Sequence, residues 1–423
     1  MYCGSCMRDN TLAAALIRKG RDVVLIPVYS PIRTDEPDVS QDRVYYGGIN
    51  IYLQQKNALF RHLPRPVDRL LDHPTLLRRA MKRAGSTSLE TAAPLTLSIL
   101  KGEDGDQKRE LSKLLQGLIE LQPSLVHLPN AFFVGLARRI RQELGIPVVC
   151  TLTGEDILIE KLPEPFQSET FALIRDRGRD VDAFLSVSRY YSNYAKERFG
   201  IAPDRIHQVP LGIRVEDHQD APPPAASRPF TIGYLARICS DKGLHLLLEA
   251  FRLLHRDGRE CRLKVAGYLG GADRPYFTAL QSQMTDHKLD RFIDYLGEVD
   301  RSEKYRMLRS IDVLSVPTVY REAKGLYVLE AMSQGIPVVQ PRHGTFPEFI
   351  ESTGGGLLCE PDDPKSLADC ITKLMNDAQL REKLGQSGRD AVCASFTDEA
   401  MADRAWDVFE SCANTRPSQL GSA

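Results

Sequence analysis

The sequence has no excess of charge of either sign, because 55 lysine and arginine residues are matched by 56 aspartate and glutamate residues, a formal net charge of -1. Overall charge therefore gives no reason to expect nucleic acid as a partner, and any anion site must be local. The chain has no apolar run near the roughly 18 residues of a membrane span. Its first residues also lack the charged-then-apolar pattern of a signal peptide. These absences predict a cytoplasmic protein.

The nine cysteines do not follow the pattern of a disulfide framework, because their number is odd and they are scattered along the chain. Reduced thiols are therefore expected. Cys3 and Cys6 have the spacing of half a redox or metal site, but no second ligand pair stands at a matching spacing. We predict no metal site, and redox chemistry at this pair is the alternative.

Short apolar runs rich in β-branched residues alternate with amphipathic segments, which indicates parallel βαβ units with helices on both faces of each sheet. The predicted class is α/β, with two doubly wound, Rossmann-like parallel sheets. The predicted strands are Asp22–Pro27, Ser124–Leu128, Pro147–Thr151, Ala183–Ser188, Thr231–Leu235, Leu263–Ala266, Phe292–Leu296, Val313–Val316 and Pro337–Gln340.

A run of prolines and small residues, "DAPPPAASRP" at 220–229, predicts a linker between two domains. The predicted divisions are an N-terminal domain over 1–217, the linker over 218–229, a C-terminal domain over 230–396, a helix over 397–413 and a disordered tail over 414–423. The amphipathic helix, which carries the only tryptophan at Trp406, is expected to pack back on the N-terminal domain.

Residues 61–83 carry seven lysine or arginine residues against two aspartates, interleaved with leucine at helical spacing. Such a segment could meet an anionic membrane surface, which would place the protein peripherally at the inner face of the membrane, or an anionic acceptor. The alternative is a solvated helical hairpin.

Two segments of the C-terminal half carry the chemistry. In the first, "FTIGYLARICSDKGLHLLLEAF", a strand leads into a loop that holds Arg237 and Lys242, and Gly243 opens a helix. Two cations at the carboxyl end of a strand, beside a helix N-terminus, can bind a diphosphate without a metal ion.

The second segment, "VYREAKGLYVLEAMSQGIPVVQPRHGTFPE", places Glu322 in a loop, Gly325 and Leu326 at the expected helix start, and Glu330 within the helix. Two carboxylates across a loop–helix junction can reach different hydroxyls of one ligand, while the amides near the helix start face a phosphate.

Together these segments resemble the retaining, nucleotide-sugar-dependent glycosyltransferases of family 4 on the GT-B fold, whose two domains face each other across a cleft. The resemblance implies that Arg237 and Lys242 hold the donor diphosphate in place of a metal ion. It also implies that Glu322 contacts the donor sugar and that Glu330 binds the ribose hydroxyls. The backbone from Gly297 to Val299 would contact the nucleobase.

The N-terminal half is similar to the family more loosely, and two departures stand out. Many relatives have a histidine before the glycine of the fifth-strand loop, where this chain has Thr153, so the sugar contact could fall to Thr153, Glu155 or His127. The family also opens with a strand and a Gly-Gly loop, whereas this chain begins at "MYCGSC". We hypothesise that the first strand is missing and that Gly4 belongs to the remaining loop, which approaches the donor phosphates.

The sequence thus predicts transfer of a sugar from a nucleoside diphosphate sugar, the co-substrate, to an acceptor hydroxyl with retention of configuration and without a metal or other cofactor. Arg237, Lys242 and Glu322 are the predicted catalytic residues. The acceptor is left open as a saccharide, a lipid or a small molecule. The alternatives are a phosphorylase or disaccharide synthase of the same fold, or a non-catalytic nucleotide- or carbohydrate-binding protein on a decayed transferase fold.

Overall fold

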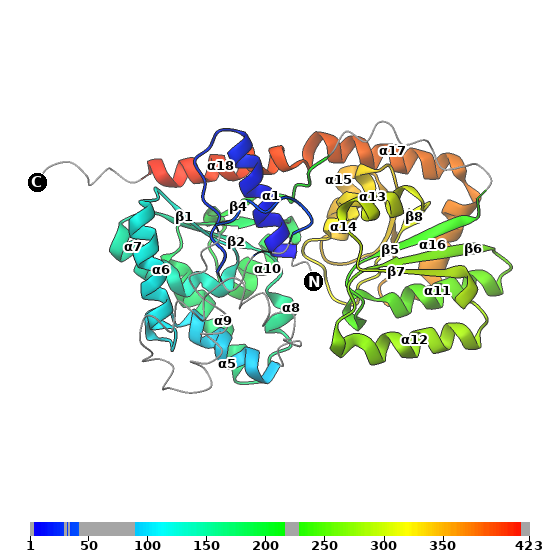
Figure 1. Cartoon of the computed structure of the whole chain (residues 1–423), viewed down its shortest axis with the longest axis horizontal. Helices are drawn as coiled ribbons and strands as arrows, with labels where there is room; N and C mark the ends of the chain where they lie inside the picture. The colour runs from blue at the N-terminus through cyan, green and yellow to red at the C-terminus, as the bar shows by residue number, and fades with distance from the viewer. Residues whose placement is uncertain (1–3, 29–31, 33, 42–88, 216–227, 416–423) are drawn as a thin grey trace, which may run out of the picture. The chain divides into compact units, whose positions relative to one another are not determined.

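The computed structural model describes residues 4–28, 32, 34–41, 89–215 and 228–415. The chain divides into two compact units, and the division falls at Pro210/Leu211 and again at Asp398/Glu399 (Figure 1). Residues before the first division and after the second form the N-terminal unit, and those between form the C-terminal unit. The basic segment 61–83, and all but the last two residues of the predicted linker 218–229, lie outside the described residues.

The N-terminal unit is built on a parallel sheet in which the strands lie in the order β1-β2-β3-β4. β2 is buried along its whole length, as expected for a parallel strand with a continuous apolar sequence and both faces covered. The strands are β1 (Val126–Leu128), β2 (Val148–Leu152), β3 (Ala183–Ser186) and β4 (Ile206–Gln208).

The helices of the N-terminal unit follow the strands in alternation, with two of them at the ends of the chain. They are α1 (Gly4–Arg18), α5 (Leu89–Leu100), α6 (Lys108–Leu121), α7 (Ala137–Leu144), α8 (Asp156–Ile159), α9 (Phe166–Arg177), α10 (Arg189–Tyr194) and α18 (Asp398–Asn414). Short 3-10 helices lie at η2 (Gly102–Asp104), η3 (Ala131–Leu136), η4 (Gly178–Asp180) and η6 (Pro203–Arg205), and a short π-helix at η5 (Ala195–Phe199).

Helix α18, from the C-terminal end of the chain, lies against α1 and shares its core (Figure 1). Leu16 of α1 and Ala405 of α18 are buried in one cluster with Val149 of β2 and Leu185 of β3. At the edge of this cluster Lys19 forms an ion pair with Asp403 at 2.8 Å. The last helix of the chain is therefore part of the N-terminal unit's core.

The C-terminal unit contains a second parallel sheet, with the strand order β10-β9-β8-β5-β6-β7. The first strand of the unit, β5, therefore lies beside the fourth, β8, and the order reverses between them. The strands are β5 (Phe230–Leu235), β6 (Cys261–Ala266), β7 (Ile293–Gly297), β8 (Val313–Leu314), β9 (Val338–Pro341) and β10 (Gly356–Cys359).

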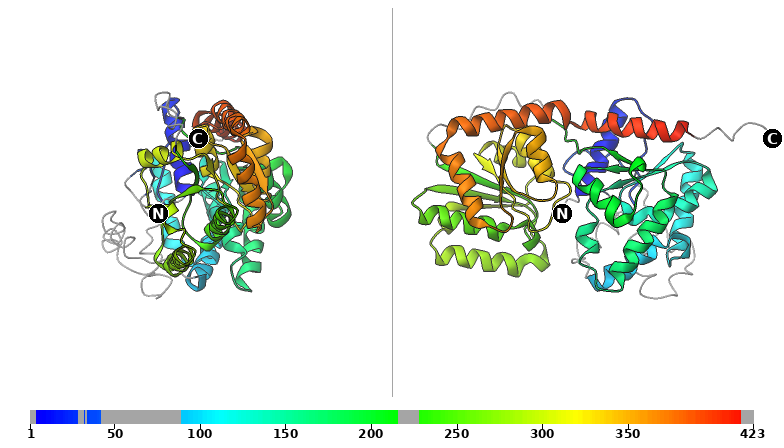
Figure 2. Two further views of the ribbon diagram at one scale, coloured as in Figure 1. Left: turned by 90° about the vertical axis from the view of Figure 1, so that its right-hand side faces the viewer. Right: turned by 180° about the vertical axis from the view of Figure 1, so that it is seen from behind.

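Helices cover both faces of this sheet (Figure 2). α11 contacts both α12 and α16, and α17 contacts both α14 and α15. The helices and single turns of this unit are η7 (Ser240–Lys242), α11 (Leu244–Arg256), η8 (Gly271–Asp273), α12 (Arg274–Asp286), η9 (Asp290–Phe292), α13 (Arg301–Arg309), α14 (Leu326–Ser333), α15 (Phe346–Thr353), α16 (Pro364–Asn376) and α17 (Ala378–Ser395).

The predicted α/β class with two parallel sheets is confirmed, but one predicted strand is wrong. Residues Asp22–Pro27 form no strand: Leu25 makes only an isolated bridge to Ser40. A strand needs a neighbour for its backbone hydrogen bonds, and among the described residues this segment finds one only at that bridge. The prediction also missed β4 and β10, because the first is a three-residue strand with polar residues and the second follows a run of glycines.

Candidate functional site

The residues predicted to carry the chemistry lie where the strand order of the C-terminal sheet reverses. Arg237 and Lys242 follow β5, and Glu322 follows β8, which is its neighbour in the sheet. In open parallel sheets, ligands bind outside the carboxyl ends of the strands at such a reversal, because the loops diverge there and leave space. The fold thus brings the two predicted segments to one edge of the sheet.

The loop after β5 is held tightly against the segment after β8. Gly243 has a φ of +69°, and a Cβ built on it would lie 1.7 Å from the carbonyl oxygen of Pro317. Only glycine fits such an approach in this backbone region. Within the loop, the Arg237 Nε donates to the Cys239 sulfur at 3.4 Å, and the Tyr234 hydroxyl donates to the Arg237 carbonyl at 3.2 Å.

Lys242 and Glu322 form a buried ion pair at the centre of this edge. The Lys242 Nζ lies 2.5 Å from Oε2 of Glu322, whose side chain is 3% exposed. Burial alone would raise the pKa of Glu322, but the adjacent lysine charge outweighs it and brings the pKa down to about 2. Glu322 is therefore ionised at neutral pH, and it orients the lysine.

Two tyrosines that the sequence analysis missed complete this cluster. The Tyr320 hydroxyl donates to Oε2 of Glu322 at 2.6 Å and also contacts the Lys242 ammonium, and the Tyr327 hydroxyl donates to the same oxygen at 3.4 Å. The ammonium lies 5.0 Å and 5.3 Å from the centres of the two rings, within range of a cation–π attraction. Burial raises the pKa of both tyrosines well above the usual value, and the Glu322 charge adds to this.

Glycines set the backbone on either side of Glu322. Gly325 has a φ of +66° and immediately precedes α14. The amides of the first helical turn, which begins at Leu326, have no partner within the helix, and Leu326 lies four residues after Glu322. Gly344 has a φ of +59°, and a Cβ there would lie 2.4 Å from the Glu322 carbonyl oxygen. The amide of Thr345 donates to that carbonyl at 2.8 Å. The "GTFPE" segment thus fixes the backbone of Glu322.

Glu330 lies on the second turn of α14, where it is 8% exposed. Its Oε1 accepts from the Nζ of Lys304, on α13, at 2.6 Å. This partner was not predicted, because Lys304 stands 26 residues away and no sequence pattern links the two. The predicted ribose contact therefore already has one oxygen occupied.

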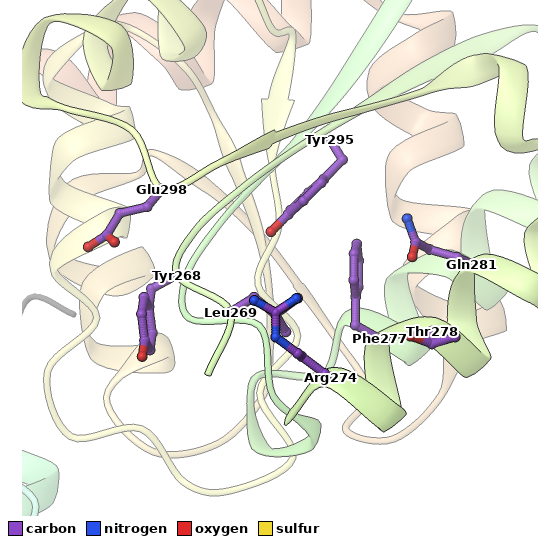
Figure 3. A pocket seen from close by; sticks show the side chains of 8 residues that line it. All are labelled: Tyr268, Leu269, Arg274, Phe277, Thr278, Gln281, Tyr295 and Glu298. Atoms are coloured by element: carbon purple, nitrogen blue, oxygen red, sulfur yellow. The ribbon is translucent and has the colours of Figure 1, made fainter. Parts of the chain in front are cut away.

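A pocket of about 580 Å³ opens at the carboxyl ends of β6 and β7, beside the predicted base-contacting residues Gly297 and Val299 (Figure 3). Figure 3 shows the Arg274 guanidinium and the Tyr295 ring directed toward each other. Phe277 packs on Tyr295 with ring centres 4.7 Å apart. The pocket is lined by Tyr268, Leu269, Arg274, Phe277, Thr278, Gln281, Tyr295 and Glu298. Aromatic faces with a nearby cation suit a flat, polar ring.

The N-terminal candidate His127 is the middle residue of β1 and is half-buried. Its Nε2 lies 2.6 Å from the Thr151 hydroxyl, and its ring packs on Phe409 of α18 with centres 5.3 Å apart. Burial, followed by the charge of Arg8, lowers the pKa of His127 to about 3. The imidazole is therefore neutral at physiological pH, and it is engaged within its own unit.

Thr153 and Glu155 lie in the loop that follows β2 and are also engaged within the N-terminal unit. Glu155 is 2% exposed, and its carboxylate accepts from the amides of Ala131, Thr153 and Gly154 and from the Tyr191 hydroxyl at 2.7 Å to 3.1 Å. The hydroxyl of Ser5, next to the predicted site residue Gly4 at the start of α1, donates to the Thr153 hydroxyl at 3.4 Å. Glu155 thus organises the loop from within.

The neighbouring residue Asp156 is also buried, at 5% exposure, but its Oδ1 accepts no hydrogen bond from the described residues. Burial, followed by the charge of Glu155, raises the pKa of Asp156 to about 7. Because the folded state holds this proton more tightly than the unfolded chain, the stability contributed by the protonated group is lost as the pH rises from about 4 to about 7.

Replacing Asp156 by Asn is therefore expected to raise the melting temperature at pH 8, by about 3 °C or more, and to change it little at pH 4. Thermal unfolding across this pH range measures the difference. Asp407→Asn, at an exposed position on α18, is the control. Its melting temperature should differ from that of wild type by the same amount at every pH. A pH-independent effect of Asp156→Asn would contradict the assigned ionisation.

Neither a metal-binding cluster nor a membrane-spanning helix is found among the described residues. In the part of the chain that the structure describes, no group of three or more His, Cys, Asp or Glu side chains is placed to hold a metal ion. Within the same residues, no helix combines the length and apolar character needed to cross a bilayer.

Two family models match parts of the N-terminal and C-terminal halves of the chain. A family model described as "Glycosyl transferases group 1" matches residues 215–391, and one described as "Glycosyltransferase Family 4" matches residues 102–217. The first covers the cluster around Lys242 and Glu322. The second covers the strands of the N-terminal sheet and the loops that follow β1 and β2.

Curated relatives match most of the chain at low identity. A GDP-mannose-dependent monoacylated alpha-(1-6)-phosphatidylinositol monomannoside mannosyltransferase from Corynebacterium glutamicum is 26% identical over 299 residues, which cover 67% of this chain and 74% of the relative. A glycogen synthase from Mycobacterium tuberculosis is 24% identical over 290 residues, which cover 68% of this chain and 69% of the relative. These relatives agree in transferring sugars and differ in what they act on.

Solved structures match the fold over nearly the whole chain. Sucrose-phosphate synthase from Thermosynechococcus elongatus superposes with a TM-score of 0.68 at 16% identity, covering 96% of this chain and 92% of the other. HepE from Anabaena, solved in complex with UDP, superposes with a TM-score of 0.64 at 17% identity, covering 92% of this chain and 100% of the other. At these identities the likeness concerns the fold.

Proposed function

Since this chain is a glycosyltransferase of the GT-B fold, we propose that it transfers a sugar from a nucleoside diphosphate sugar to an acceptor hydroxyl, with retention of configuration and without a metal ion. The observation that carries the proposal is the cluster of Lys242, Glu322 and the start of α14 at the reversal point of the C-terminal sheet. A cation, a carboxylate and free helix amides are the groups that a sugar diphosphate requires.

In this proposal Lys242 and Arg237 bind the diphosphate and offset the charge that develops as it leaves. The bond between the anomeric carbon and the phosphate oxygen breaks, and a bond from the acceptor oxygen forms on the same face. The acceptor proton passes to the departing diphosphate. Fixed cations can replace a metal ion in this role because they need no reorganisation when the charge appears.

Glu322 has two functions in the proposed donor complex. Its carboxylate is ionised and holds Lys242 through Oε2, while Oε1 accepts from the amide of Lys324 at 3.2 Å. A carboxylate oxygen has more than one acceptor position, so a hydroxyl of the donor sugar can be bound without displacing the lysine. The tyrosines Tyr320 and Tyr327 keep this carboxylate in place.

The nucleobase is proposed to enter the pocket beside Gly297 and Val299. Tyr268 and Tyr295 offer aromatic faces there, and Arg274 offers donors to a base carbonyl. The name of one relative specifies GDP-mannose, and the HepE structure contains UDP. Guanine and uracil nucleotides should therefore both be tested for binding. The acceptor is proposed to be a saccharide, a lipid or a small molecule.

A thermal-shift panel with UDP, GDP, ADP and their sugar conjugates, each with and without EDTA, tests the donor site. A ligand that binds only the folded state adds about 2.7 kcal/mol of stability at a hundred times its dissociation constant. We expect a shift with one nucleotide family that EDTA does not change. A shift abolished by EDTA would refute metal-free binding.

Hydrolysis of the stabilising sugar nucleotide, followed by chromatography, separates a transferase from a binding protein. Glycosyltransferases bind their donor in a reactive arrangement, so slow transfer to water is expected when the acceptor is absent. Binding without any hydrolysis or transfer, across a panel of saccharide and lipid acceptors, would favour the non-catalytic alternative. No shift with any nucleotide would overturn the proposed function.

A further inference from the structure

The buried ion pair between Lys304 and Glu330 joins two helices of the C-terminal unit. The two side chains are 8% and 10% exposed, and the Nζ lies 2.6 Å from Oε1 of Glu330. No described residue donates a hydrogen bond to the second carboxylate oxygen, Oε2. The carboxylate is thus held at one oxygen and open at the other.

Stability alone is a poor explanation for this pair. Removing two charges from water costs about as much as their attraction returns, so well-packed apolar residues would serve as well at this position. The surrounding residues of α14, from Tyr327 to Met332, are otherwise apolar and buried. Oε2 is not among the buried side-chain atoms that lack a partner, so it can be reached from outside the helix and can accept from a ligand hydroxyl.

Lys304 lies on the helix that begins beside the proposed nucleobase pocket. Helix α13 begins at Arg301, directly after the Gly297–Val299 loop beside the base pocket, and Lys304 stands one turn into it. A reciprocal capping box fixes the helix start, with Asp300 accepting from the Glu303 amide at 2.8 Å and Glu303 accepting from the Asp300 amide at 2.9 Å. The ion pair therefore ties the helix at the base pocket to the helix that carries the ribose carboxylate.

We propose that Lys304 is a positioning residue for the donor ribose: it holds Oε1 of Glu330 so that Oε2 faces a ribose hydroxyl. The inference rests on the proposed donor site and deepens it. Lys304 itself makes no contact with the reacting atoms. Its loss should leave Glu330 free to turn, so that the hydroxyl contact loses its geometry while diphosphate binding at Lys242 remains.

The test compares binding of the stabilising nucleoside diphosphate with that of its 2′-deoxy and 3′-deoxy forms, by calorimetry. Wild type, Glu330→Gln, Lys304→Met and Lys304→Arg are measured side by side. Wild type is expected to favour the ribonucleotide by about tenfold or more over one deoxy form, the scale of one hydrogen bond to a charged group. Lys304→Met should reduce this ratio to that of Glu330→Gln, and Lys304→Arg should restore most of it.

A purely structural lysine would change the melting temperature and leave the ratio intact, and that result overturns the inference while the donor site stands. A wild type that binds nucleotide without preferring ribose also overturns it. Failure of every nucleotide to bind wild type overturns both proposals. Should Lys304→Met not fold, Lys304→Leu, which likewise has no hydrogen-bond donor, replaces it in the same comparison.

Discussion

Replacing Lys242 by Ala is expected to lower kcat by about 100- to 1000-fold, the effect of losing one preorganised donor to a developing anion. Arg237→Ala should act in the same direction, because both side chains belong to the loop at the reversal point of the sheet. Initial rates with the donor found in the binding panel measure the loss. Arg256→Ala, at a residue of the same unit whose side chain is 62% exposed, is the matched control.

The Lys242 variant needs a second control, because the lysine also neutralises a buried carboxylate. Without Lys242, Glu322 stays buried at 3% exposure and loses the charge that holds its pKa low, so the variant should also unfold more easily. Adding Glu322→Gln removes the unpaired charge. The double variant should regain stability and remain inactive, whereas turnover near wild type in Lys242→Ala would remove the lysine from the mechanism.

The sequence was most informative where function depends on local patterns. Arg237, Lys242 and Glu322 each follow a buried strand, and parallel strands present their carboxyl ends at one edge, so their proximity in the C-terminal unit could be predicted. The tyrosine Tyr320 could have been found as well, since it stands two residues before Glu322 in the same loop. Its role as a bridge to Lys242 depends on side-chain geometry that no spacing rule contains.

Interactions between distant segments could not be predicted in the same way. Lys304 reads as an ordinary solvent-facing helix residue, and only the packing of α13 near α14 gives it a buried partner in Glu330. In the N-terminal unit, Glu155 was a candidate for contact with a sugar, yet its two carboxylate oxygens accept from the amides of Ala131 and Gly154. Asp156, the next residue, has the unpartnered oxygen instead.

The backbone approach at Gly243 leads to the second large effect. We expect Gly243→Ala to lower the free energy of unfolding by about 3 kcal/mol or more, because strain at a positive φ adds to a backbone clash. The new Cβ would lie 1.7 Å from the Pro317 carbonyl oxygen, so the loops after β5 and β8 must separate. Denaturant unfolding measures this, and donor binding should weaken in parallel because Lys242 would move away from Glu322.

Gly258→Ala isolates the contribution of strain from that of the clash. Gly258 lies just beyond the other end of α11 with a φ of +74°, nearly that of Gly243, and a Cβ there would meet no atom within 4 Å. Its replacement should cost about 1 kcal/mol, the penalty of the left-handed backbone alone. If both variants lost the same free energy of unfolding, the loops after β5 and β8 would have moved apart at no cost. The close approach at Gly243 would then not determine the distance between Lys242 and Glu322.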